Sequence, residues 1–107
     1  MKQQNLYIRI KNKMKEATDI LNYLNINTTA GDECNKCQED LDLLLLSSLE
    51  DVRLINDDFT LSAALSHIIP VLLSLNRIKE AKELYLKITI HFIRNELDDA
   101  YSILRTT

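Results

Sequence analysis

The sequence has few of the residues that build turns, with one glycine, one proline and no tryptophan in 107 residues. A many-stranded sandwich or barrel needs turn residues at frequent, regular intervals, so this scarcity excludes such folds. Hydrophobic residues nevertheless make up 46% of the chain, which excludes a globally disordered polypeptide. The sequence therefore predicts one all-α domain over residues 1–107.

Long apolar runs are also missing from the sequence. The longest, HIIPVLLSL at residues 67–75, is far too short to span a bilayer and contains Pro70. The first residues, MKQQNLYIRIKNK, lack the apolar segment of a signal peptide. We therefore expect a soluble, cytoplasmic protein that does not insert into membranes.

Cysteine is limited to one CxxC pair, Cys34 and Cys37. Such a pair supplies half of a tetrahedral zinc site, but His67 and His91 are too far apart in sequence to complete a finger. A redox-active CxxC needs a βαβ context, which this sequence does not have. We expect two reduced thiols at the start of a helix, with no bound metal or other cofactor.

Catalytic signatures are absent as well. The sequence has no glycine-rich phosphate loop, nucleophile elbow or HExxH motif. Its adjacent carboxylates, at 39–40, 57–58 and 98–99, point in different directions from a helix and are expected to be solvated rather than convergent. Both histidines lie in apolar runs, where we expect packed side chains rather than general bases. The sequence predicts that the protein is not an enzyme.

Charges of the two signs are segregated along the chain, whose net charge is −3. Residues 1–24 carry five basic and two acidic side chains, whereas residues 25–60 carry two basic and nine acidic ones. Phosphate binding needs clustered lysine and arginine, so the acidic middle argues against a nucleic-acid partner. The basic first helix can complement either the acidic middle or an acidic partner.

Apolar spacing predicts about five helices, joined by short connections into a bundle or short solenoid. They are expected at residues 5–24, 36–54, 59–75, 77–94 and 97–104, with a loop at residues 25–35. The second helix is apolar around most of its circumference, which favours a central position. Asp58 or Thr60 is expected to cap the third helix, Pro70 to bend it and Asn76 to end it.

Residues 61–94 resemble one tetratricopeptide unit, a helix–turn–helix with fixed packing positions. In the second helix Ala81 takes the small position, Tyr85 the aromatic one and Ile88 the next. The matching apolar positions of the first helix are Leu65, Ile68 and Leu72. The sequence departs from the pattern at Ile69, where Gly or Ala is preferred.

The first half of the chain resembles the tetratricopeptide-like chaperones of type III secretion needle subunits. The resemblance is carried by Lys15-Glu16-Ala17, Ile20, the pair Tyr23-Leu24 and the run LLLLSSL at 43–49. It is weaker beyond Leu49, where this chain lacks the family's glycine-containing turn.

This resemblance implies a virulence-associated chaperone that holds the helical segment of a secreted needle subunit in a concave apolar groove. A small helical co-chaperone would complete the hetero-oligomer. Carried onto this chain, the partner-binding residues are Ala63, Ser66, Pro70, Leu73, Leu97, Ala100 and Leu104.

The acidic middle keeps an alternative function open. Several bacterial immunity proteins are small acidic helical bundles, and acidic faces speed association with basic toxin domains. In that case the binding surface would comprise the acidic residues from Asp32 to Asp42 and the pair Asp57-Asp58. A general adaptor built on one helix pair also remains open.

Overall fold

The computed structural model describes residues 3–26 and 32–105, and of residues 25, 26 and 32–34 it describes the backbone alone. Within these ranges the chain forms five α-helices, one short 3₁₀ helix and no strand, so the all-α prediction is confirmed. The helices are α1 (Gln3–Ile26), α2 (Asp32–Val52), α3 (Asp58–Ser74), α4 (Ile78–Tyr85), α5 (His91–Ala100) and the 3₁₀ helix η1 (Ser102–Arg105).

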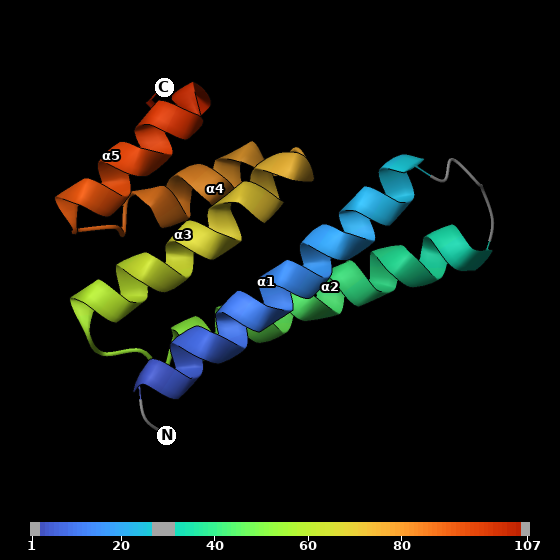
Figure 1. Ribbon diagram of the computed structural model, residues 1–107, viewed down its shortest axis with the longest axis horizontal. Helices are drawn as coiled ribbons and strands as arrows, with labels where there is room; N and C mark the ends of the chain where they lie inside the picture. Colours follow the sequence, from blue (N-terminus) through green and yellow to red (C-terminus); the bar gives the residue numbers. More distant parts are fainter. Residues whose placement is uncertain (1–2, 27–31, 106–107) are drawn as a thin grey trace.

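Helix α3 lies at the centre of the molecule and contacts each of the other four α-helices. Figure 1 shows α1 and α2 side by side on one side of α3, and α4 and α5 on the other. The Cα atoms span 42 × 35 × 17 Å, so the molecule is flat. A thickness of 17 Å accommodates about two layers of helices.

The spacing of apolar residues predicts one buried face of α1, made of Leu6, Ile10, Met14, Ala17, Leu21 and Leu24. The first four are buried and face α2 and α3, whereas Leu21 and Leu24 are only partly buried against the core. The four buried residues pack with Leu41 and Leu45 of α2 and with the buried residues of α3 into one core cluster.

No helix in the described part of the chain is long and apolar enough to cross a membrane.

The predicted central position of the second helix is wrong, because α2 lies at the edge of the molecule. It packs mainly on α1, and Leu43 and Leu46 are 63% and 57% exposed.

One buried polar contact fixes the register of α2 on α1. The Asp51 carboxylate, only 7% exposed, is 2.8 Å from Lys13 Nζ and 3.2 Å from an Arg9 guanidinium nitrogen.

The predicted fourth helix over residues 77–94 is also wrong. Helix α4 ends at Tyr85, and a new helix, α5, begins at His91. The segment between them contains Ile88, Thr89 and Ile90, three consecutive β-branched residues that disfavour a helix. The Thr89 N–H instead donates to Ser62 Oγ of α3, at 3.3 Å. The predicted last helix at 97–104 is in fact the end of α5 followed by η1.

The ends of α3 show how the chain enters and leaves the central helix. The N-cap is Asp57 rather than the expected Asp58 or Thr60, and its carboxylate accepts from the Thr60 N–H at 2.7 Å. At the other end Asn76 has φ +61°, a left-handed conformation that asparagine tolerates. The N–H groups of Asn76 and Arg77 donate to Leu73 and Leu72, which satisfies the last carbonyls. Asn76 therefore terminates α3 as predicted.

The loop predicted over residues 25–35 is shorter than expected. Helix α1 extends to Ile26 and α2 begins at Asp32, so both helices enter the predicted loop. Residues 27–31, which include the glycine, lie outside the described residues.

Candidate functional site

One row of surface hollows in the described chain lies along the seam between α1 and α3. It consists of three hollows that follow one another along α3, with volumes of about 510, 520 and 220 Å³. We call these the first, second and third hollows and the whole surface the trough. Residues of α5 and Tyr101 complete the first and third hollows.

The first hollow is mainly apolar and aromatic. Its lining residues are Gln4 and Tyr7 of α1, Phe59, Thr60 and Ala63 of α3, and Phe92 and Ile93 of α5. Phe59 and Phe92 lie against each other across α3 and α5, with ring centroids 6.0 Å apart. Since both residues are more than half exposed, they present apolar surface to solvent rather than to the core.

The second hollow carries positive charge beside a half-buried histidine. Its lining residues are Lys11, Asn12, Met14, Lys15 and Thr18 of α1, and Ser66, His67, Pro70 and Val71 of α3. The His67 Nε2 and Tyr7 hydroxyl lie 3.0 Å apart, within hydrogen-bond distance, and this contact crosses the seam between the first and second hollows, which share no lining residue. Burial lowers the pKa of the His67 imidazole below its ordinary value of 6.5, and the nearby Lys11 lowers it further.

The third hollow is smaller and lies where α3 ends. Its lining residues are Thr18, Leu21 and Asn22 of α1, Pro70, Val71 and Ser74 of α3, and Tyr101. It shares Thr18, Pro70 and Val71 with the second hollow, so the two are continuous. Pro70 is therefore placed at the junction of two hollows, inside a helix that runs through it without a break.

Three of the seven residues predicted to contact a partner line this trough. Ala63 lines the first hollow, Ser66 the second, and Pro70 both the second and the third. They come together because spacings of three and four residues place them on one face of α3.

The other four predicted residues lie elsewhere. Leu97 and Leu104 are buried in the core, and Leu73 is partly buried against it. Ala100 is exposed at the end of α5 but does not line the three hollows. Leu97, Ala100 and Leu104 are expected on one helix over residues 97–104. Because α4 ends early and α5 begins at His91, these residues instead lie at the end of α5 and in η1.

Sequence reasoning missed the aromatic side chains and the lysines of the trough. The expected helix over residues 77–94 places Phe92 within one continuous helix, which the structure divides in two, and Phe59 is expected to be the first residue of the helix over 59–75. The signal in the sequence is the run of β-branched residues at 88–90, which follows α4 and places Phe92 near the start of a separate helix. Lys11 and Lys15 are exposed, away from the buried residues of α1.

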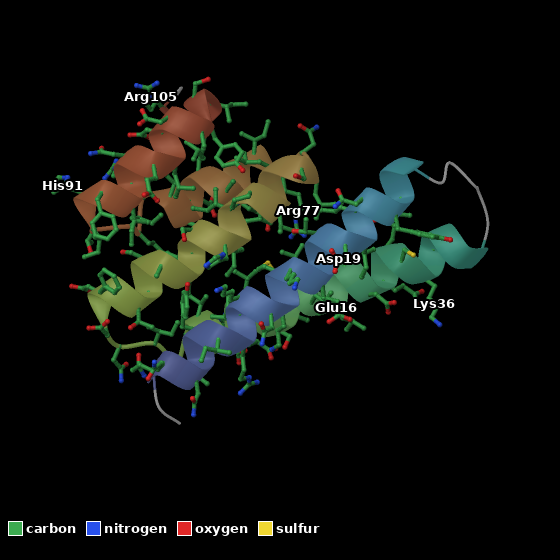
Figure 2. All side chains as sticks on the ribbon, viewed as in Figure 1. Glu16, Asp19, Lys36, Arg77, His91 and Arg105 are labelled. Carbon is green, nitrogen blue, oxygen red and sulfur yellow. The ribbon has the colours of Figure 1, made fainter. Side chains whose placement is uncertain are left out.

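The histidines and cysteines are the candidate metal ligands of the sequence. Among the described residues no three His, Cys, Asp or Glu side chains are grouped so that they could hold a metal ion. Figure 2 shows His91 at the outer end of α5, where it is exposed rather than packed as expected. Cys37 is a half-buried free thiol, and the Cys34 side chain lies outside the described part.

The acidic residues proposed for toxin binding lie on two different helices. Glu39, Asp40 and Asp42 are exposed in the middle of α2, and Asp57 and Asp58 are exposed at the start of α3. The side chains of Asp32 and Glu33 lie outside the described part of the chain.

Neither a protein family model, nor a curated protein, nor a solved structure matches this chain.

Proposed function

We propose that this protein is a chaperone that holds an amphipathic helix of a secreted protein, of the type III needle-subunit kind, in the trough. The observation that carries the proposal is the exposed pair Phe59 and Phe92 at one end of a depression with an apolar base. Recognition of a helix in a groove needs apolar anchors and no catalytic group. Aromatic side chains also supply much of the binding energy where protein surfaces meet.

The size of the trough supports a helical ligand. From Phe59 to Ser74, α3 rises about 22 Å, which is about four helical turns. A helix of similar length lying along it would contact all three hollows in succession. A single extended side chain or a small molecule would fill only one of them.

We further propose that the helices form a tetratricopeptide-like stack, in which α1/α2 and α3/α4 are successive pairs and α5 begins a third. The trough is then lined by the first helix of each pair, as in tetratricopeptide grooves. Burial of Ala81 and Tyr85 at the small and aromatic positions of α4 supports this assignment, whereas Ile88, also buried, lies beyond the end of α4 and departs from the pattern. Ile69, also fully buried, is a further departure from the pattern, since a larger side chain there separates neighbouring helices.

A second protein partner is consistent with the exposed apolar residues of α2. Leu43 and Leu46 belong to the LLLLSSL run on which the family resemblance rests, and both are exposed. A cytoplasmic hetero-oligomer with a small helical co-chaperone would cover them.

The proposed function is tested by affinity capture from the native host lysate with wild-type protein and two variants. Phe92→Asp places a charge in the first hollow, whereas Leu86→Asp places one at a 71% exposed leucine that lines none of the three hollows. We expect a helical protein that wild type and Leu86→Asp retain at high salt and Phe92→Asp loses. A synthetic peptide of its helical segment must then bind wild-type protein directly.

The same experiment separates the alternative function. An immunity protein binds a basic toxin domain through carboxylates, so its partner is released as the salt concentration rises. A basic partner that is lost at high salt and insensitive to Phe92→Asp would contradict the chaperone proposal.

A further inference from the structure

The charge of the trough is opposite to that of the whole protein. The chain has a net charge of −3, yet the charged side chains that line the three hollows are Lys11 and Lys15, with His67 beside them. No aspartate or glutamate lines these hollows. This asymmetry indicates that the ligand of the trough carries negative charge.

The two lysines are available to a ligand because they lack the partners that the other basic residues of α1 have. Arg9 and Lys13 pair with Asp51 on the side of α1 that faces α2. Lys11 and Lys15 are exposed and form no ion pair within the described residues. The nearest carboxylates along α1, Glu16 and Asp19 (Figure 2), are exposed and do not line the hollows.

The distance between the apolar and the charged hollow, measured along α3, defines the spacing of apolar and charged groups that a ligand needs. The first hollow is lined by Ala63, and the second hollow extends to Pro70, seven residues later. Seven residues of helix are two turns and about 10 Å. Lys11 and Lys15 are themselves one helical turn apart and lie on one face of α1.

We propose that the trough binds an acidic amphipathic helix, whose apolar anchor enters the hollow at Phe59 and Phe92 and whose carboxylates contact Lys11 and Lys15 about two turns away. The inference rests on the proposed function and adds the charge and the spacing of the ligand. The apolar anchor supplies affinity, and the carboxylates fix the direction in which the helix lies, since the reverse direction leaves the lysines unpaired.

The test uses two synthetic peptides of about 18 residues that are equally helical. Both carry the same leucines on one face; two turns away, one carries two glutamates and the other two lysines. Binding is measured by fluorescence anisotropy at low ionic strength. Four proteins are compared: wild type, the double variant Lys11→Glu/Lys15→Glu, the first-hollow variant Phe92→Asp, and Lys79→Glu, which changes an exposed lysine of α4 that lines none of the three hollows.

Wild type is expected to bind the glutamate peptide about tenfold more tightly than the lysine peptide. The double variant is expected to reverse this preference, and Lys79→Glu to keep it. Equal binding of both peptides by wild type and the double variant, abolished by Phe92→Asp, would overturn the acidic-ligand inference and leave the helix-binding function standing. If neither peptide binds wild type, both the acidic-ligand inference and the helix-binding function are overturned. Concentration-dependent self-association that blocks binding would identify a second copy of this chain as the occupant and would overturn the inference.

Discussion

Phe59 at the start of α3 and Phe92 at the start of α5 lie with their rings 6.0 Å apart and inclined by 46°, although they are 52% and 56% exposed. Tilted aromatic pairs at this separation attract each other by about 0.5–1.5 kcal/mol beyond the area that they bury. The pair is thus held in place by a contact that leaves half of each ring available. Such preorganised aromatic surface lowers the entropy cost of binding a ligand.

The first prediction follows from this exposure. Phe92→Ala should lower the free energy of unfolding by only about 1 kcal/mol, because it removes a ring contact and little buried area. The same substitution should weaken binding of a helical peptide at least about tenfold, because it removes the apolar anchor point. Urea denaturation and fluorescence anisotropy measure the two effects on one preparation. A loss of stability as large as that of a core substitution would show that Phe92 has a structural role instead.

The second prediction concerns the carboxylate between α1 and α2. Lys13→Met removes the 2.8 Å partner of the buried Asp51, whereas Arg9 at 3.2 Å remains. We expect the free energy of unfolding to fall by about 1–3 kcal/mol, because a buried charge loses a partner. The matched control is Lys11→Met on the same helix, expected to stay within about 0.5 kcal/mol of wild type. In a double-mutant cycle, Asp51→Asn should cost less in the Lys13→Met background than in wild type, and simple additivity would contradict the coupling.

The third prediction is a pH dependence of stability due to His67. Burial first, and then the nearby Lys11, lower the pKa of this imidazole in the folded protein, so the unfolded chain takes up the proton at higher pH. Its contribution to stability is therefore complete above pH 6.5 and is lost as the pH falls from 6.5 through the lower folded-state pKa. Urea midpoints between pH 7 and about pH 5 should decrease for wild type and for the exposed-site control His91→Gln.

His67→Gln should remove most of that slope, and an unchanged slope would assign it to other groups. The carboxyls of Asp57 and Glu80 do not interfere in this pH range. Hydrogen bonds to Thr60 lower the pKa of Asp57 below its ordinary 3.8, and a hydrogen bond from Arg77 lowers that of Glu80 below 4.5. Their contributions are therefore present above these values and are lost only in more acidic solution.

The fourth prediction compares two leucines with opposite environments. Leu65 of α3 is fully buried, whereas Leu43 of α2 is 63% exposed. Leu65→Ala should lower the free energy of unfolding by about 2–5 kcal/mol, because it removes apolar contacts and leaves a cavity. Leu43→Ala should change it by less than about 0.5 kcal/mol. Similar losses for both variants would indicate that α2 is buried in solution, for example by a second molecule.

The fold was predictable from the sequence where periodicity and packing agree. The spacing of Leu6, Ile10, Met14 and Ala17 predicts the buried face of α1, and the structure confirms it. The position of α2 was not predictable from its own composition. Its leucine run is apolar on nearly all sides, so the sequence alone does not indicate which leucines a neighbour covers. In this chain α3, with fully buried Leu65, Ile68, Ile69 and Leu72, takes the central position instead.

The site was predictable only where it follows from a single helix. Ala63, Ser66 and Pro70 share a face of α3 by spacing alone, and they line the trough. Which residues of α5 line the trough depends on where the helix ends after Tyr85. The start of α5 determines the directions in which Phe92 and Leu97 point. Tyr85 also donates a hydrogen bond to Asp98, and the Arg94 guanidinium lies 4.7 Å from the centre of the Tyr85 ring. These contacts join α5 to α4 across the non-helical segment between them. The spacing of residues in the sequence does not specify these contacts.

The account depends most directly on where a helical ligand sits, and nuclear magnetic resonance of the isotope-labelled chain locates it. Adding the glutamate peptide should shift amide signals of α1, α3 and the first turn of α5, around Tyr7, Ala63, Pro70 and Phe92. Amides of the outer face of α2, such as those of Leu43 and Leu46, should stay unchanged. Shifts confined to α2 and to Asp57 and Asp58, with the trough unaffected, would contradict the helix-binding trough.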